Sequence, residues 1–283
     1  MTINIRTNVA SLRAQRMLSA TSQSLSNTYN RLSSGRRINS ASDDAAGLAI
    51  ADSLRTSQRI ATVAVRNAQD GISAVSIADG ALEQVSAFLQ RLSELAQQAA
   101  TGTYTADQRS AMQGEFSALG SEIERIATTT AFNGAQLLAG GNAMVLQVGF
   151  DSTSNSRFTV DQANATLAGL GLGSSSLSYS LTGNSIELGQ SAARFAIDGI
   201  NGALQSMNSI RGGLGAVESR LISSVSNLQV ARENYAAAES RIRDVDVASE
   251  AAELTRLNIL QQTGAAILAQ ANLQPQLALA LLQ

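Results

Sequence analysis

Apolar residues recur at alternating steps of three and four along two long stretches of the chain. The stepping is unbroken between residues 75 and 99, on Val75, Ala78, Leu82, Val85, Leu89, Leu92, Ala96 and Ala99. Residues 214–245 repeat it with one polar position, on Leu214, Val217, Leu221, Ser224, Leu228, Ala231, Tyr235, Ala238, Ile242 and Val245. This spacing places the apolar side chains on one narrow stripe of a helix. It favours rod-like coiled helices, the second about 48 Å long, over the helices of an ordinary globular bundle.

Two shorter stretches continue the pattern. The first consists of Met112, Phe116, Leu119, Ile123 and Ile126. The second lies near the C-terminus and consists of Leu257, Leu260, Gly264, Ile267 and Ala271. Most of the chain outside its middle is therefore predicted to be helical.

Helix ends are predicted where residues that favour breaks and caps occur. Gly35 can adopt the left-handed conformation after a helix that ends near residues 32–34. The run 39–44, Asn-Ser-Ala-Ser-Asp-Asp, offers capping oxygens for the next helix, so we expect a connector over roughly residues 34–43. Gly102 and Thr103 should interrupt the second helix. Pro275, the only proline, should stop or kink the last one.

The middle of the chain has a different composition. Residues 142–190 carry only Asp151, Arg157, Asp161 and Glu187 as charges and are rich in Gly, Ser, Thr and Asn. Short extended runs at 144–148, 158–160 and 177–181 are separated by turn residues. We predict two or three strands of β-hairpins with loops. The Gly-Leu-Gly-Leu-Gly run at 169–173 lacks the spacing and helix start of a nucleotide loop and is interpreted as a loop.

The two ends of the chain carry opposite charges. Residues 1–40 contain six arginines and no acidic residue, whereas residues 244–283 contain four acidic residues and one arginine, which gives +6 and −3. Two oppositely charged helices with narrow apolar stripes suggest packing side by side and against further copies of the chain. Such packing indicates an assembly subunit rather than an enzyme. The residues expected to carry it are Ile5, Val9, Leu12, Leu18, Leu25, Leu32, Leu257, Leu260, Ile267 and Ala271.

Missing residue types narrow the possible chemistry. The chain has no Cys and no His, and its 20 basic residues are all Arg. Thiol nucleophiles, His bases, Cys/His zinc sites, Schiff-base lysines and the P-loop lysine are therefore excluded. We expect no enzyme, no cofactor and no metal. The net charge of −2 gives no reason to expect nucleic acid or an anionic membrane as a partner.

No targeting segment is evident in the sequence. Residues 1–10 lack the apolar core of a signal peptide. No run of about 18 apolar residues is present, so no transmembrane helix is expected. On these grounds alone the chain would be assigned to the cytoplasm, unless a dedicated export machine reads some other signal.

Several motifs resemble those of one family, the bacterial flagellins. They are Arg-Leu-Ser-Ser-Gly at 31–35, Arg-Ile-Asn-Ser-Ala at 37–41, Asp-Asp-Ala-Ala-Gly-Leu-Ala-Ile at 43–50, Arg-Asn-Ala at 66–68, Asp-Gly-Ile-Ser at 70–73, Gly-Ala-Leu at 80–82, Gln-Arg-Leu at 90–92, Glu-Leu-Ala at 94–96, Phe-Asn-Gly at 132–134, Ser-Arg-Ile at 240–242, Asp-Val-Asp at 244–246, Ile-Leu-Gln-Gln at 259–262 and Ala-Gln-Ala-Asn at 269–272. The resemblance covers roughly residues 1–140 and 190–283. Together these motifs are highly specific to the family, although no single one is.

The resemblance implies a mainly α fold, an elongated coiled-coil bundle of paired terminal segments with a small central β-hairpin region. Residues 1–40 and 244–283 would form the inner coiled-coil domain. Residues 41–141 and 191–243 would form the outer-tube rod domain. Residues 142–190 would supply its hairpin and loops, in place of the large outer domains of longer flagellins. The chain is similar to a short, minimal flagellin.

The resemblance also implies a function and partners. A flagellin polymerises into the extracellular flagellar filament used for motility, after export in the unfolded state by the flagellar type III machine. Its implied partners are further copies of itself, hook-associated and cap proteins, and an export chaperone at the C-terminal region. The alternative is the hook–filament junction protein, which has a related fold. Flagellin-borne zinc proteases need His and are excluded.

One further implied partner is the vertebrate Toll-like receptor that recognises flagellin. The residues that match the family's receptor contacts are Arg91, Leu95 and Glu115. Ordinary exposed or inter-subunit positions are the alternative interpretation. A secreted adhesin is a third functional class, since the Ser and Thr residues of 152–180 could bind ligands or carry sugars. Plain solvated loops explain these residues equally well and are favoured.

Overall fold

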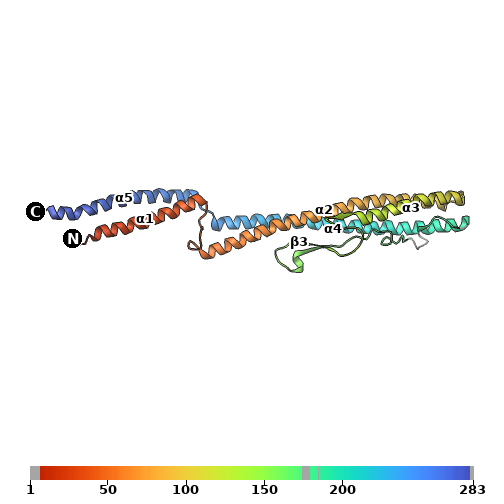
Figure 1. Ribbon diagram of the computed structural model, residues 1–283, viewed down its shortest axis with the longest axis horizontal. Helices are drawn as coiled ribbons and strands as arrows, with labels where there is room; N and C mark the ends of the chain where they lie inside the picture. The colour runs from red at the N-terminus through yellow and green to blue at the C-terminus, as the bar shows by residue number, and fades with distance from the viewer. Residues whose placement is uncertain (1–6, 174–178, 184, 281–283) are drawn as a thin grey trace. The chain divides into compact units, whose positions relative to one another are not determined.

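The computed structural model of the chain describes residues 7–173, 179–183 and 185–280, and it is mainly helical (Figure 1). The helices are α1 (Val9–Ser34), α2 (Ala45–Ala100), α3 (Ala106–Thr129), α4 (Ile186–Arg243) and α5 (Val247–Ala280). The predicted fold class is confirmed. The contacts divide the chain into two compact units, residues 59–232 and residues 1–58 with 233–283.

The core of the 59–232 unit lies along the predicted seam of α2. All eight seam residues from Val75 to Ala99 are buried. Phe116 and Ile123 from α3 and Ala193, Ile200 and others from α4 belong to the same core cluster. The 3,4 stepping therefore identified the buried face of α2 correctly, because a stripe of that spacing stays on one side of a slightly supercoiled helix.

The seam of α4 is less deeply buried than that of α2. Leu214, Leu221 and Leu228 are buried, and the other helical seam positions are half-buried. One predicted boundary is wrong, because α4 ends at Arg243 and Val245 lies in the connector to α5. The helix also begins well before the predicted stretch, at Ile186.

A β-hairpin packs on one part of this core. Strand β3 (Met144–Gln147) pairs antiparallel with β4 (Arg157–Val160), which confirms two of the three predicted strands. In the third run, 177 and 178 lie outside the described residues, and 179–181 are not in a strand. The side chain of Leu146 in β3 lies so close to the α2 backbone at Gly71 that no Cβ would fit there. This glycine lets the hairpin pack directly on the helix.

A second, very short hairpin follows α3. Strands β1 (Ala131–Phe132) and β2 (Ala135–Gln136) are joined by Asn133 and Gly134, which have φ angles of 48° and 80°. Two successive positive φ angles match the right-handed twist of a tight hairpin, and Asn-Gly is the residue pair that tolerates them best. This hairpin was not predicted, although it contains the Phe-Asn-Gly motif at 132–134.

The corner between α2 and α3 confirms the predicted break. Thr105 and Gln108 form a capping box at the start of α3. Arg109 is buried and donates from Nη1 to the carbonyls of Ala99 and Thr101, at 3.0 and 3.2 Å. A guanidinium at the C-terminal end of α2 satisfies carbonyls that have no helical partner.

The other unit contains α1, α5 and the connectors that precede α2 and follow α4. Gly35 ends α1 with φ 68°, as predicted. The connectors run side by side, since Arg37 N donates to Arg243 O at 2.7 Å and Val245 N donates to Gly35 O at 3.1 Å. Asp44 Oδ1 accepts from Gly47 N at 2.8 Å and caps the first turn of α2.

Pro275 does not end the last helix, because α5 continues to Ala280. Of the two predicted effects, a stop or a kink, the stop is therefore wrong. A proline inside a helix removes one backbone hydrogen bond and introduces a clash with the preceding turn, and a long helix can continue beyond such a local cost.

The sequence analysis expected no helix that could span a membrane, but α2 meets a criterion based on length and mean hydropathy. An 18-residue window of α2 reaches a mean hydropathy of 1.2, and a third of it is buried. By length and composition alone this helix could cross a membrane. Core helices meet the same criterion, and the seam of α2 supplies the core of the 59–232 unit.

Candidate assembly surfaces

Helices α1 and α5 run antiparallel along each other (Figure 1). Asn8 Nδ2 donates to Ala271 O at 2.8 Å near one end of the pair, and Arg31 lies 3.8 Å from Glu250 near the other. The face of α1 that meets α5 steps by three and four, and its residues are Ser11, Ala14, Leu18, Thr21, Leu25, Thr28 and Leu32. Leu18 packs on Gly264 of α5.

This contact face contains mostly small or polar side chains. Ser11 and Thr28 are buried in it, and Leu25 is the only buried large apolar side chain of α1. Small side chains allow close helix approach but remove little apolar area from water, at roughly 25 cal/mol per Å². The α1–α5 pair is therefore weakly stabilised by its internal contacts.

Large apolar side chains remain exposed on both helices after they pair. Val9 on α1 is 49% exposed, and Ile267 on α5 is 62% exposed. The set of exposed large apolar residues on these helices is Val9, Leu12, Met17, Tyr29, Val247, Ile259, Leu260, Ile267 and Leu273. At 100° per residue, those of α5 lie on several sides of the helix. A helix that is apolar all round is normally covered all round, and α1 covers one side only.

The residues expected to carry assembly fall into two groups. One group faces the partner helix of the same chain and consists of Leu18, Leu25, Leu32, Leu257 and Ala271. The second group is exposed and consists of Val9, Leu12, Leu260 and Ile267. Ile5 lies outside the described residues. Ser11 and Thr28 were not predicted, because they are small and polar and only their 3,4 spacing marks them.

The charges of the two helices pair at only one position among the described residues. Arg31 and Glu250 form the single ion pair between α1 and α5 there, at 3.8 Å. Glu253 instead pairs with Arg256 on its own helix. Arg13 and Arg16 are exposed and form no ion pair within the described part of the chain. Most of the basic charge of α1 is therefore left available to other molecules.

A buried arginine stabilises the end of α4. Arg243 Nη1 lies 3.5 Å from Asp52 Oδ1 on α2 and 3.7 Å from Glu239 Oε1 one turn earlier on α4. Its own carbonyl accepts the hydrogen bond from Arg37 N. The Arg243 side chain is only 9% exposed, so loss of its partners would leave a buried charge uncompensated.

A charged cluster joins α2 and α3 on the surface of the 59–232 unit. Arg91 Nε donates to Glu115 Oε1 at 2.9 Å, and Arg91 Nη1 donates to Glu94 Oε2 at 2.8 Å. The carboxylates of Glu94 and Glu115 raise the pKa of Arg91. Leu95 is only 2% exposed and belongs to the core. The expectation that Leu95 is a surface contact is therefore corrected, whereas Arg91 and Glu115 are exposed as expected.

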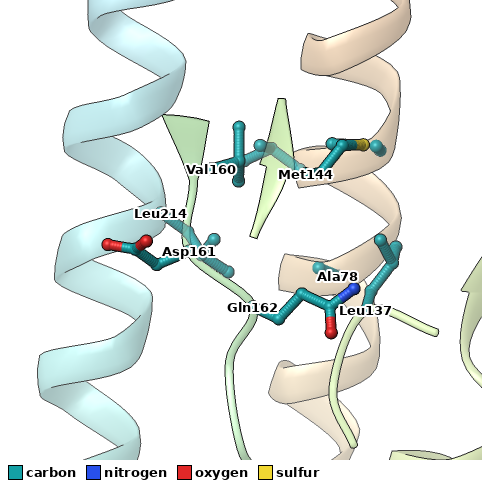
Figure 2. Close-up of a pocket in the computed structure, with 9 residues that line it drawn as sticks. Ala78, Leu137, Met144, Val160, Asp161, Gln162 and Leu214 are labelled. Carbon is teal, nitrogen blue, oxygen red and sulfur yellow. The ribbon is translucent and has the colours of Figure 1, made fainter. Parts of the chain in front are cut away.

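One cavity of the 59–232 unit is too small for a cofactor. This small cavity lies beneath the β3–β4 hairpin, and Figure 2 shows Ala78, Val160 and Leu214 around it. The centre of a water molecule can move within about 20 Å³ of this cavity, so the cavity has room for about one water. The described residues contain no cluster of three or more Asp or Glu side chains suited to a metal ion.

Comparisons with known proteins assign the chain to a family. The model of the bacterial flagellin N-terminal helical region matches residues 5–143, and that of the C-terminal helical region matches residues 197–282. The flagellin of Halalkalibacterium halodurans is 41% identical over 280 residues, with 99% of both chains covered. The flagellar filament 33 kDa core protein of Treponema phagedenis is 38% identical over 291 residues, with 99% of both covered.

Among solved structures, the crystal structure of Bacillus cereus flagellin aligns with a TM-score of 0.48 and 29% identity, over 58% of this chain and 88% of that one. The two family models, together with relatives that match from end to end, carry the assignment. The chain belongs to the bacterial flagellin family and is a structural subunit of the flagellar filament.

Proposed function

We propose that this subunit builds the inner layer of its filament by packing α1 and α5 against the same helices of neighbouring copies. The observation that carries the proposal is the apolar surface that these helices leave exposed after pairing. Burial of one Leu or Ile side chain contributes roughly 1.5–3 kcal/mol. Several such side chains per copy are sufficient to drive association of a weakly paired helix pair.

The domain division that follows from this proposal is the one expected from the sequence. Residues 1–40 and 244–283 would form the inner domain, residues 41–141 and 191–243 the rod, and residues 142–190 its hairpin and loops. Helix ends support the boundary between the inner domain and the rod, because α1 ends at Ser34 and α4 ends at Arg243. Flagellins are structural proteins, so the exposed surfaces are interpreted as packing surfaces rather than as catalytic ones.

We further propose that the chain is exported unfolded by the flagellar type III machine and is extracellular in the assembled filament. The lack of cysteine supports this route, because no disulfide can lock the chain before or during passage. The hook-associated and cap proteins, and a chaperone that binds the C-terminal region, are the partners proposed for the exported chain.

Electron microscopy of the purified chain under polymerising conditions tests the proposal. Long filaments formed by this chain alone are expected. The junction protein of related fold would give no long filaments by itself. Failure of concentrated, folded protein to polymerise in any polymerising condition would contradict the proposed self-assembly.

We also propose that the Toll-like receptor for flagellin recognises the monomer at Arg91 and Glu115. The exposure of both side chains and their ion pair, at 2.8 Å between Arg91 Nη2 and Glu115 Oε1, support this site. Arg91→Ala should reduce reporter-cell activation by the monomer without unfolding it. Arg125→Ala is the matched control, because Arg125 is also exposed and paired, with Glu122.

Two results would contradict the receptor proposal. One is full signalling by a folded Arg91→Ala monomer. The other is equal signalling by monomers and by stable filaments that shed no subunits, since the proposal places recognition on the monomer.

A further inference from the structure

An apolar groove lies on α2 at the beginning of the 59–232 unit. It is open to solvent, with about 260 Å³ of space for the centres of water molecules, and its principal lining residues are Arg59, Ile60, Val63, Asn67, Gln147 and Gly149. Val63 is 50% exposed within it. The wall opposite α2 is held in place because Asn67 Nδ2 donates to Gln147 O at 2.9 Å. The groove is therefore a preformed feature of the surface.

An apolar ridge lies on the first turns of α4. Leu188 and Phe195 are 58% and 56% exposed and are seven residues apart, so both lie on one face of the helix. The side of these turns that faces the core carries Ala193 and Ala196, which are buried. Gly183 lies against the backbone and Cβ of Leu188, but more than half of the surface of Leu188 and of Phe195 stays exposed.

The groove and the ridge lie at opposite ends of the 59–232 unit. Helices α2 and α4 are antiparallel there, because Asp79 pairs with Arg211 and Val65 packs with Leu228. Val63 is 16 residues from Asp79, and Leu188 is 23 residues from Arg211. These 39 helical positions at 1.5 Å each separate the two features by roughly 60 Å. A chain cannot place its own ridge in its own groove.

The rims of the two features carry opposite charges. Arg59 borders the groove, and Glu187 lies beside Leu188 at the ridge. Both side chains are exposed, and neither forms an ion pair within the described residues. Apolar complementarity with an unpaired opposite charge on each side is the arrangement expected of two surfaces that meet.

We propose that the Leu188–Phe195 ridge of one copy packs into the Ile60–Val63 groove of the next copy, with Glu187 beside Arg59. This inference rests on the filament function and assigns to it one specific contact. When one end of a copy meets the other end of the next in this way, the contact is head to tail, and it continues from copy to copy as long as the rotation between copies does not close a ring. That geometry suits a filament.

Crosslinking tests the contact directly, because the chain has no cysteine of its own. A Val63→Cys/Leu188→Cys variant is polymerised and treated with a short bis-maleimide. The expected product on a denaturing gel is a ladder of dimers, trimers and longer species, absent from the treated monomer. The control is Ile77→Cys/Leu188→Cys, since Ile77 is an exposed aliphatic residue of the same helix about 21 Å further along.

The crosslinking outcomes are distinguishable from failure of the function itself. Normal filaments with no ladder, or with an equal ladder from the control, would overturn the contact while the filament function stands. A dimer from Val63→Cys alone would show that the groove faces itself, which also overturns it. If the unmodified chain forms no filament, both the function and the contact fail.

Charge reversal supplies a second test that does not depend on crosslinking. Arg59→Glu should raise the concentration needed for polymerisation roughly five- to tenfold, because it places like charges together. Arg59→Glu/Glu187→Arg should restore that concentration to within about twofold. A double variant that assembles no better than the single one would overturn the pairing of these two surfaces.

Discussion

The same 3,4 spacing produces a self-sufficient core in residues 59–232 and an incomplete one in residues 1–58 with 233–283. In the first unit the seam of α2 is occupied mainly by Leu, Val and Ala, and side chains of helices α3 and α4 pack on it. In the second unit the buried apolar residues among those described are Leu25, Ile38, Ala51, Leu257 and Ala271. Spacing decides which face is buried, but side-chain size decides how much that burial stabilises the unit.

The exposed residues differ in the same way. The α1–α5 pair places small side chains such as Ser11 and Gly264 between its helices and leaves Val9, Leu260 and Ile267 outside. A monomeric protein normally does the reverse, with its larger apolar side chains inside. The comparison indicates that the terminal helices are completed by other copies, whereas the 59–232 unit is completed by its own residues.

The largest effect is expected from Leu89→Asp, which attacks the self-sufficient unit. Leu89 is fully buried in the α2 seam, so the substitution removes apolar contacts and buries an unpaired charge. We expect a loss of at least about 4 kcal/mol in the free energy of unfolding. Thermal unfolding followed by circular dichroism measures it, and a melting temperature close to that of the unsubstituted chain would contradict the assigned core.

Deletion of residues 244–283 should abolish filaments but leave the 59–232 unit folded. The seams of α2 and α4 lie within 59–243, whereas α1 loses the only helix that pairs with it in the described chain. Sedimentation should detect no polymer, and calorimetry should still show a cooperative transition. Filaments of normal length from the truncated chain would disprove the role of the C-terminal segment.

Leu260→Asp separates folding of the monomer from assembly. Leu260 is exposed in the single chain, so the free energy of unfolding should change by less than about 0.5 kcal/mol. The concentration needed for polymerisation should rise more than about tenfold, because each 1.4 kcal/mol lost at the interface is a factor of ten. Leu260→Met, which keeps volume and polarity, is the control. Assembly of the Asp variant at wild-type concentrations would remove Leu260 from the interface.

The smallest effect is expected from Asp79→Asn. Hydrogen bonds from Arg211, at 2.8 and 3.1 Å, lower the pKa of Asp79. A lowered carboxylate pKa contributes stability above the ordinary value of 3.8, and this contribution is lost as the pH falls through the lowered pKa. Both side chains are more than a third exposed, so we expect a loss below about 1 kcal/mol at neutral pH.

Unfolding measured from pH 7 to pH 2 checks this expectation. The curves of Asp79→Asn and of the unsubstituted chain should converge at the acidic end. Asp70→Asn, at an exposed carboxylate of the same helix, is the control. If the stability of Asp79→Asn differed from that of the unsubstituted chain by a constant amount down to pH 2, the ion pair would not be the cause of the difference.

The sequence predicted the helices and their breaks well, because spacing, glycines and caps are local signals. Gly35 ends α1 and the break near Gly102 separates α2 from α3, as these signals predict. The Asn133–Gly134 hairpin was missed although its signal is equally local. The extent of α4 could not be predicted, because the helix runs through Gly212 and Gly213, where helix propensity is poor and tertiary packing prevails.

The candidate assembly surface was predicted less completely than the fold. Leu260 and Ile267 fit the helical spacing as well as Leu257 does, but only Leu257 faces the partner helix of the same chain. Rotation of a helix about its axis depends on the partner, which periodicity cannot specify when a helix is apolar on several sides. Leu95 illustrates the same limit, because a motif match gave no information about its burial.

Hydrogen exchange of backbone amides in the monomer and in the filament tests most directly whether the terminal helices depend on other copies. Amides of α2 and α4 between residues 75 and 232 should be protected in both states. Amides of α1 and α5 should exchange rapidly in the monomer and become protected by at least about a hundredfold in the filament, since the pair alone is weakly stabilised. Equal protection of α1 and α5 in monomer and filament would contradict the account.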